Sequence, residues 1–403
     1  FFFKQKTANE ILSGLVGSEM CIRDRSTALV AAGMIASAPA SAKMKLSVGG
    51  YMEQWVGYVS QDDVGTADYS GVDVKSDSEV HFKGMVKLDN GMSVGVNMQL
   101  EGNGGGDTID ESYLIVNGGF GEINLGSENS ALYKMHYGAK DMGIGFNSGD
   151  QSSWVNTGGS ISQSGHFRQP MGSTNIEPNG MNDSEKITYY TPRVNGFQLG
   201  VSYAPWAGED GGAQFDRNAN KSDYVTAGAN YKAKMGGMYV GISAGYGTVT
   251  DAEAGAGADS EPQATAFGVR LGMGAFGVNI ATANFEDTGS ADGTAVAGSI
   301  TYDSGPMGIS LGYHHGEREG GAAKAGQAEA DVFHLSAKYS LGKGVTWAST
   351  LGMATYTTDD PTVTDDEHSG TYLVTGLKAS FAVTLGLLKC STCCNTGSGI
   401  LFA

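Results

Sequence analysis

The chain has 403 residues, of which 63 are glycine and 8 are proline, and its 25 basic side chains stand against 43 acidic ones. The net charge of −18 argues against nucleic acid as a partner, because phosphate binding needs clustered Lys and Arg. A charged fraction of 17% excludes a highly charged disordered polymer, and glycine without a Gly-X-Y period excludes collagen. The longest apolar stretch, residues 28–38, is shorter than the roughly 20 residues that a membrane helix needs. These exclusions leave a large, turn-rich β protein.

The beginning of the chain differs from the rest. Residues 1–25 match nothing in the composition that follows and resemble translated adapter sequence, so we interpret them as an adapter-derived artefact; the alternative is a genuine cytoplasmic extension. Residues 26–42 read STALVAAGMIASAPASA, an apolar core followed by Ala40-Ser41-Ala42. This is the pattern of a secretory signal peptide with its cleavage site. The sequence therefore predicts an exported protein whose mature chain begins at Lys43.

The end of the chain departs from the pattern in the same way. Residues 382–403 change composition, and we interpret them as a read-through tail; the alternative is a genuine tail. All four cysteines of the chain lie in the two suspect end segments, at Cys21, Cys390, Cys393 and Cys394. Residues 43–381 therefore predict a domain without disulfides or thiol chemistry. The cysteine cluster lacks a His or a second Cys pair, so no zinc site is expected.

The dominant signal between the two ends is an alternation with a period of two. In residues 92–101 (MSVGVNMQLE) every second side chain is apolar, and the others are small, polar or charged. This period predicts strands that are apolar on one face. Sixteen such segments follow one another along the chain, at 44–60, 79–89, 92–102, 108–117, 120–127, 184–191, 197–206, 221–235, 238–249, 263–273, 276–285, 293–303, 307–317, 331–341, 345–357 and 369–381.

The connections between the strands are of two kinds, in strict alternation. Seven are short turns with hairpin chemistry, such as Asn90-Gly91 and Gly236-Gly237, and eight are longer, mostly acidic loops. Both ends of the domain fall on the side of the turns. No proline interrupts a strand interior, as expected if every backbone N–H there is needed by the sheet.

This arrangement predicts an all-β fold, a sixteen-stranded antiparallel transmembrane β-barrel. A sheet can cross a bilayer only when it closes, because its backbone groups find no water there. An even number of strands with turns on one side and long loops on the other is typical of outer-membrane barrels. Aromatic residues near strand ends, such as Trp55 and Tyr339, fit interfacial girdles. A barrel of sixteen strands is too wide for side chains to fill, so it holds water.

Four stretches carry a family resemblance: KMKLSVGGYMEQWVGY (43–58), GGFGEINLGSENSALYKMHYGA (118–139), SEKITYYTPRVNGFQLGVSYAP (184–205) and TGLKASF (375–381). They resemble the general-diffusion porins of Gram-negative bacteria, particularly the alphaproteobacterial type, and the resemblance extends from about 43 to 381. It implies a homotrimer in the outer membrane that passes ions and small hydrophilic solutes. It also implies a third loop folded into the barrel, carried here to 128–183, and a last strand that ends at Phe381 and is read by the barrel-assembly machinery.

Selectivity is expected where this loop narrows the barrel, because a loop longer than about 15 residues is uncommon unless it is functional. Candidates for the acidic side of the constriction are Glu128, Asp141 and Asp150. Candidates for the basic side are the loop residue Arg168 and, on the lumen face of their strands, Lys83, Lys87, Lys186, Arg270, Lys338 and Lys378. Opposite charges across a narrow opening orient dipolar solutes and filter ions. For each single charge, an ordinary solvated lumen surface is the alternative.

The charge of the mature chain bears on ion preference. Residues 43–381 hold 20 basic and 40 acidic side chains, a net charge of −20, and part of this excess lies in expected external loops, for example at Asp359 and Asp360. A negative mouth concentrates cations, so a modest cation preference is predicted. Alternatively, these acids bridge lipopolysaccharide through divalent ions or keep the loops soluble.

No catalytic or cofactor-binding pattern is present in the sequence. His314 and His315 are neighbours on a strand and point to opposite faces, so they cannot chelate one ion. A GxSxG nucleophile elbow and a phosphate-binding loop are absent. We therefore expect neither an enzyme nor a cofactor or metal. The alternatives to a general channel are a solute-specific channel, an outer-membrane barrel enzyme and a purely structural surface protein.

Overall fold

The computed structural model describes residues 44–103, 108–145, 150–156, 166–167, 173–208, 215–217, 221–251, 261–286, 292–319, 327–359 and 366–385. The segments interpreted as adapter-derived (1–25) and as a signal peptide (26–42) lie outside these residues. So do Arg168, Asp360 and all but the first four residues of the expected tail.

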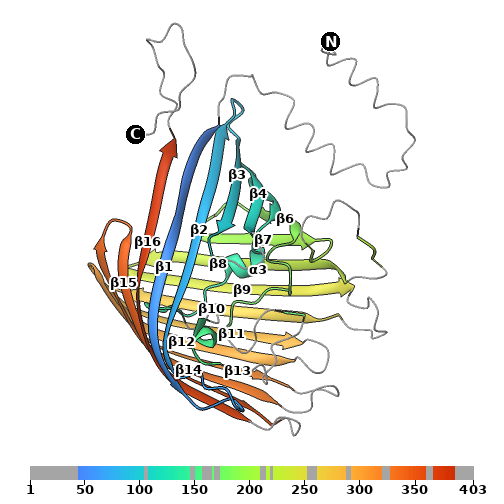
Figure 1. Cartoon of the computed structure of the whole chain (residues 1–403). Coiled ribbons are helices and arrows are strands. Elements are labelled where there is room, and N and C mark those ends of the chain that lie inside the picture. Colours follow the sequence, from blue (N-terminus) through green and yellow to red (C-terminus); the bar gives the residue numbers. More distant parts are fainter. Residues whose placement is uncertain are drawn as a thin grey trace, which may run out of the picture.

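Sixteen strands make up almost all of the described chain and close into one barrel. Neighbours in sequence pair antiparallel throughout, and β1 pairs with β16 to close the sheet, so the blue and red strands run side by side in Figure 1. The predicted fold class is confirmed. The strands are β1 (Lys45–Gln61), β2 (Gly71–Lys87), β3 (Ser93–Glu101), β4 (Ile109–Gly118), β5 (Gly121–Ser127), β6 (Glu185–Tyr190), β7 (Phe197–Ala204), β8 (Ser222–Met235), β9 (Met238–Asp251), β10 (Gln263–Met273), β11 (Phe276–Glu286), β12 (Gly293–Ser304), β13 (Met307–Arg318), β14 (Ala328–Gly342), β15 (Val345–Thr358) and β16 (Glu367–Leu385).

The two faces of the barrel wall carry different side chains. On β10 the large outward side chain of Phe267 is 54% exposed, whereas the inward Ala266 beside it is fully buried. Ile242 of β9, 47% exposed, repeats the pattern. An apolar outer face is stable against lipid and unstable against water, so the alternation seen in the sequence is that of a membrane barrel.

The largest differences from the predicted strand boundaries lie in β2 and β16. Residues 71–78, expected as part of a loop, form the start of β2, because β1 offers backbone partners as far as the Val59–Gly71 pair. The last strand, expected to end at Phe381, continues to Leu385, which pairs with Leu46 of β1. Both strands are longer because a neighbouring strand extends beside them and its N–H and C=O groups need partners.

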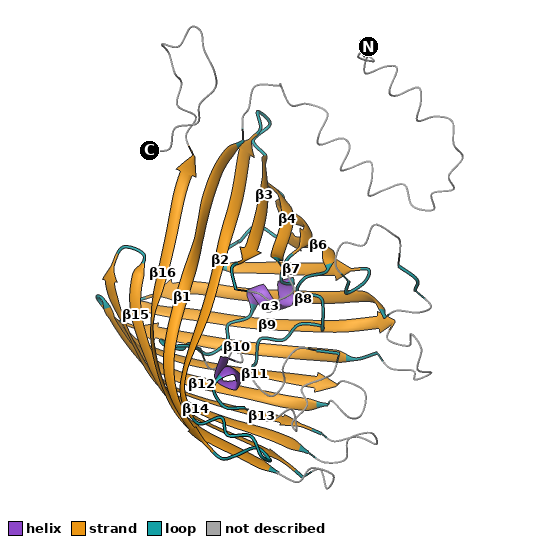
Figure 2. Ribbon diagram, in the orientation of Figure 1, coloured by secondary structure: helices purple, strands orange, loops and turns teal. Residues whose placement is uncertain are grey.

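The long connection between β5 and β6 holds the two short helices of the described chain. They are α3 (Ala131–Met135) and the 3₁₀ turn η1 (Asp150–Ser153). Figure 2 shows α3 within the outline of the barrel, and it contacts β6, β7, β8 and β9. Among the described residues, no helix is both long and apolar enough to cross a membrane.

Candidate functional site

The β5–β6 connection lies against the inner face of the wall, beginning with α3. A Cβ atom added at Gly228 of β8 would lie 2.6 Å from the carbonyl oxygen of Ala131. One added at Gly245 of β9 would lie 2.2 Å from Cδ1 of Leu132. The missing side chains of these wall glycines therefore let the helix approach the sheet. The backbone N–H of Ala131 also donates a 2.9 Å hydrogen bond to Oγ of Ser202 on β7.

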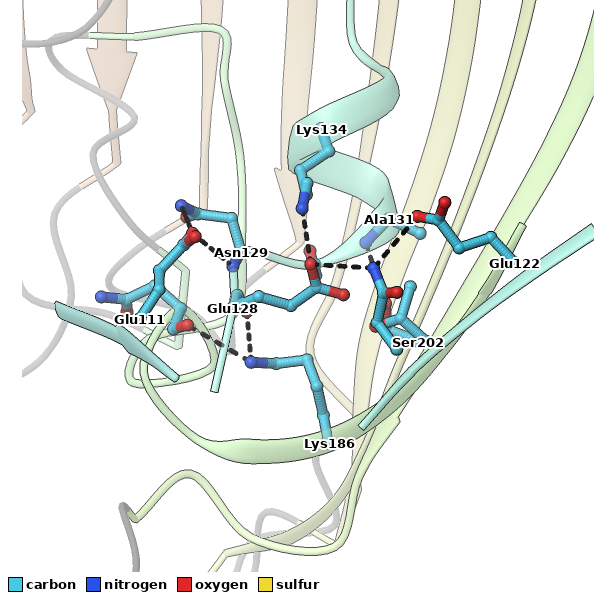
Figure 3. Close-up of polar contacts among 12 residues, drawn as sticks. Glu111, Glu122, Glu128, Asn129, Ala131, Lys134, Lys186 and Ser202 are labelled. Atoms are coloured by element: carbon cyan, nitrogen blue, oxygen red, sulfur yellow. Dashed lines mark hydrogen bonds and ion pairs between the residues drawn. The ribbon is translucent and has the colours of Figure 1, made fainter. Parts of the chain in front are cut away.

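A buried carboxylate, Glu128, holds the start of this connection in place. Its side chain is 1% exposed, and its Oε2 lies 2.5 Å from Nζ of Lys134 on α3 (Figure 3). Nδ2 of Asn124 donates to the same oxygen at 3.2 Å. Burial alone would lower the pKa of Lys134, but the charge of Glu128 raises it overall, so the ammonium stays protonated.

Further charged groups surround the backbone of the same turn. Lys186 of β6, 3% exposed, donates to the carbonyl oxygen of Glu128 and, at 2.7 Å, to that of Ser184. Glu111 of β4 accepts hydrogen bonds from the backbone N–H and Nδ2 of Asn129 at 3.2 and 3.0 Å. Glu177 accepts from the N–H of Ser130. Buried polar groups thus fix the path of the chain as it turns away from the wall strands. The sequence had singled out Glu128 and Lys186, but not Glu111 or Glu177.

A second buried carboxylate, Asp141, ties the connection to the opposite side of the barrel. Its Oδ1 accepts a 2.8 Å hydrogen bond from Oγ of Ser310 on β13, and the same Oγ accepts one from the N–H of Met142 at 2.9 Å. Its Oδ2 lies 3.3 Å from Nδ1 of His334 on β14. Nε2 of His334 lies 2.5 Å from the hydroxyl of Tyr372 on β16. One carboxylate therefore links three wall strands to the connection.

The environment of Asp141 keeps it ionised. Its side chain is 3% exposed, and burial alone would raise its pKa. The hydrogen bond to His334 and the charge of its ring outweigh burial, and the hydroxyls of Ser336 and Ser310 act in the same direction. These contacts hold the pKa of Asp141 well below its usual range. Gly143 packs closely here, since a Cβ on it would clash with Oγ1 of Thr350.

Between and beyond these two anchors the connection keeps touching the wall. The N–H of Tyr137 donates to Oγ of Ser243 at 2.8 Å, and Nε of Arg270 donates to the carbonyl oxygen of Gly138 at 2.8 Å. Farther along, the ring of Trp154 lies where a Cβ on Gly57 of β1 would be. The described parts of the connection therefore follow the inner face from β6 through β9 and β13 to β1.

The basic candidates lie on the inner face, near the ends of their strands. Lys338 forms an ion pair with Asp303 at 2.9 Å. Lys378 pairs with Glu53 at 3.2 Å and lies 5.1 Å from the ring centre of Trp55. In the part of the chain that the structure describes, Lys83 and Lys87 have no ion-pair partner.

The acidic candidates are not alike in position. The carboxylate of Glu128 is buried against Lys134 of α3 and Asn124 of β5, whereas that of Asp141 contacts Ser310 and His334 of the wall and also borders a cavity of about 380 Å³. Asp150 lies in η1, and Arg168 lies outside the described residues. His334 and Ser310, the partners of Asp141, were not singled out from the sequence. The alternation does put both on the inner face, which is the one signal that could have pointed to them.

Two observations concern metal ligands. His314 is fully buried on the inner face, while His315 contacts Glu317, so the neighbouring histidines point to opposite faces as predicted. Within the described ranges, carboxylate oxygens of Glu79, Glu101 and Asp110 lie within 4.8 Å of one another. A register shift between β3 and β4 brings Asp110 beside the other two, which a regular alternation does not predict.

Solved structures share this architecture at low sequence identity. A loop-deletion form of the outer membrane protein OmpT of Vibrio cholerae matches with a TM-score of 0.56 and 13% identity, covering 84% of this chain and 99% of that one. The anion-selective porin of Comamonas acidovorans matches with a TM-score of 0.56 and 15% identity, covering 84% and 100%.

Two comparisons of sequence agree with the barrel. Outer membrane porin protein 32 of Delftia acidovorans is 27% identical over 184 residues, which is 42% of this chain and 47% of that protein. The match thus spans about half the length of this relative. The family model of Gram-negative porins matches residues 26–360. The chain therefore belongs to the Gram-negative porins, and its closed sixteen-stranded barrel is a protein of the outer membrane.

Proposed function

We propose that the protein is a non-enzymatic, water-filled channel for the passive diffusion of ions and small hydrophilic solutes. The observation that carries this proposal is the division of the wall, with large apolar side chains outside and small or polar ones inside, as at Ile242 and Ser243. Sixteen strands enclose more space than inward side chains of this size fill. The remaining volume is polar and therefore holds water.

The proposed passage runs beside the β5–β6 connection. The connection covers the wall from β6 to β1, so the passage lies between it and the inner face of β2, β3 and β4. Glu128 and Asp141 then act as positioning residues, because each is buried in contacts that hold the connection. Asp150, Arg168 and the basic residues Lys83, Lys87, Arg270, Lys338 and Lys378 remain proposed lining groups of the pore.

A modest cation preference is proposed for this channel. It is supported by the net charge of −20 over residues 43–381 and by the acids that the inner face carries on β2 to β4, such as Asp77 and Glu79. The anion selectivity named for the Comamonas acidovorans porin does not transfer at 15% identity. In a tenfold salt gradient the zero-current potential should have the sign of cation preference, and the opposite sign would contradict the proposal.

The proposed partners follow from the outer-membrane setting. They are lipid and lipopolysaccharide on the apolar outer face, the barrel-assembly machinery acting on β16 near Phe381, and two further copies of the chain. Support for the trimer comes from one similar structure, a trimer form of Vibrio cholerae OmpT, which matches with a TM-score of 0.52 and 12% identity.

A solute-specific channel is the second candidate. A cavity of about 380 Å³ on the inner face is lined by Glu53, Lys338 and Lys378, so charges of both signs border one open volume. Such a site could hold a solute instead of letting it pass freely.

Planar-bilayer recording of the purified protein tests both candidates. General diffusion predicts stepwise conductance that rises with salt and is not blocked by millimolar solutes. Saturable block by one solute class would favour the specific channel. An absence of conductance would overturn the proposal in favour of a structural surface protein, and hydrolysis of lipid or ester substrates would favour an enzyme.

A further inference from the structure

The inner face of the barrel carries different charges at its two ends. Short turns join the strands at one end, which we call the turn end, and the long connections lie at the other, the loop end. Basic side chains gather at the turn end, and we call six of them the basic ring: Lys83, Lys87, Lys232, Arg270, Lys338 and Lys378. They come from β2, β8, β10, β14 and β16, so they are spread around the wall.

The position of the basic ring follows from the strand bounds. Five of its members lie within four residues of the turn end of their strands. The sixth, Lys378, lies opposite Thr346 in the sheet, and Thr346 is the second residue of β15 after the β14–β15 turn. Open volume borders the ring. Lys338 and Lys378 line the cavity of about 380 Å³, Arg270 lines one of about 220 Å³, and Lys83 lines one of about 160 Å³.

The loop end carries acids instead, on one side of the wall. β2, β3 and β4 contribute six inward or bulge positions there, which we call the acidic stripe: Asp73, Asp77, Glu79, Glu101, Asp110 and Glu111. The hydroxyl of Tyr51 contacts Glu79 at 2.6 Å and Asp77 at 3.2 Å. Lys75 forms an ion pair with Asp73, which is one acid of the six, so the stripe keeps an excess of negative charge.

Local pairing does not cancel the charge of the basic ring. Asp303 and Glu53 each pair with one of its lysines. Across the described residues, however, Lys83, Lys87 and Lys232 have no acidic partner. The turn end therefore keeps a net positive charge, while the opposite end of the same lumen is negative.

We propose that this separation makes the channel an ionic rectifier, an inference that rests on the proposed channel function. A negative wall admits mainly cations and a positive wall mainly anions. When the loop side is electrically positive, cations enter through the acidic stripe and anions through the basic ring, so both accumulate in the lumen and conductance is high. When the polarity is reversed, both are drawn out and each must be resupplied through the zone that repels it, so conductance is low.

Current–voltage curves of single channels in planar bilayers test this inference. Because fixed charges act over a Debye length of about 30 Å in 10 mM salt and about 3 Å in 1 M salt, the currents at opposite polarities should differ about twofold in dilute salt and be equal in concentrated salt. The quantity to measure is the ratio of the larger to the smaller of these two currents, because a channel can insert into the bilayer in either direction. A linear curve in 10 mM salt would overturn the inference and leave the channel itself standing, whereas a lack of conductance would refute the channel.

A matched pair of variants at the two ends of β8 assigns the effect to the ring. Lys232→Gln removes a charge at the turn end and should lower the ratio, while Lys221→Gln removes the same charge at the loop end and should leave it unchanged or raise it. The triple variant Lys83→Gln, Lys87→Gln, Lys232→Gln should lower the ratio further than Lys232→Gln alone. Equal effects of the two single variants would refute the role of the ring, even if the triple variant failed to fold.

Discussion

The β5–β6 connection is held by two buried carboxylates that do the same work in different ways. Glu128 has a permanent cation beside it, with Lys134 at 2.5 Å and Lys186 on its carbonyl oxygen. Asp141 has no lysine or arginine partner within the described chain and is held by the hydroxyl of Ser310 and the ring of His334.

The difference has a physical consequence for each anchor. A buried ion pair that loses one partner leaves a charge without compensation, which is costly in a low-dielectric interior. Asp141 is held by hydroxyls and one imidazole ring, so its replacement leaves no lysine or arginine without a partner, and the groups left behind are cheaper to desolvate. The Glu128 anchor is therefore expected to be the more sensitive to substitution, although both tie the same segment to the wall.

The largest expected effect is that of Glu128→Ala. It leaves the ammonium of Lys134 without its partner and should destabilise the anchored segment by about 1.5–3 kcal/mol, since that side chain is itself 33% exposed. The thermal unfolding midpoint of the purified protein should fall, and open-channel current noise should rise as the segment comes loose. Glu185→Ala, which removes an exposed carboxylate from β6, is the control and should change neither. Equal effects of the two variants would remove the distinction between anchor and surface.

A smaller effect is expected for Asp141→Asn. The amide keeps the shape of the side chain but loses the charge that His334 and Ser310 bind, at a cost of about 1–2 kcal/mol. Current noise should increase by less than in Glu128→Ala, with little change in the unfolding midpoint. Asp89→Asn, in the exposed β2–β3 turn, serves as the matched control. If Asp141→Asn proved the more damaging variant, the comparison between the anchors would be reversed.

The most gradual effect is a pH dependence at His136, which lies between the anchors and contacts Oγ1 of Thr174 at 3.1 Å. Burial, with the charge of Arg270, lowers the pKa of His136 from 6.5 to about 4. Between these values the unfolded segment binds more protons than the folded one, so stability falls as the pH drops from 6.5 towards 4. Asp141 does not contribute to this pH dependence in most of the window from pH 6.5 to 4. Its pKa is lowered in the folded segment, so its stabilising effect is lost only below about pH 4.

Current noise recorded from pH 7.5 to 4.5 measures this dependence. It should rise gradually below pH 6.5 in the wild-type channel. His136→Gln, which cannot take up a proton, should flatten the rise. An unchanged slope in this variant would assign the dependence to other groups.

Much of the fold could be predicted from local patterns. Alternation with a period of two marked all sixteen strands, and the bounds of β10, at residues 263–273, agree to the residue. The largest boundary errors, in β2 and β16, occur at strand ends that depend on a neighbour. Residues 71–78 carry charged side chains that are typical of a loop, and only pairing with β1 makes them a strand.

The candidate site was less accessible to sequence reasoning. Glu128 and Asp141 could be selected as candidates because they lie in the longest loop. That their side chains are buried could not be predicted from the sequence. Glu111 and Ser310 are ordinary inward positions on β4 and β13, and nothing in the local sequence distinguishes them from their neighbours. They become important because a segment far away in the chain meets them.

The sequence by itself determined which face of each strand meets lipid, because the spacing of apolar residues is a local property of the backbone period. It also determined how many strands there are, and on which side the turns lie. Only the tertiary structure decided which inward groups the β5–β6 connection covers and how the remaining charges divide between the two ends of the lumen. Those properties depend on contacts between residues more than 100 positions apart, such as Asp141 and His334, and on the register that brings distant strands to the same height.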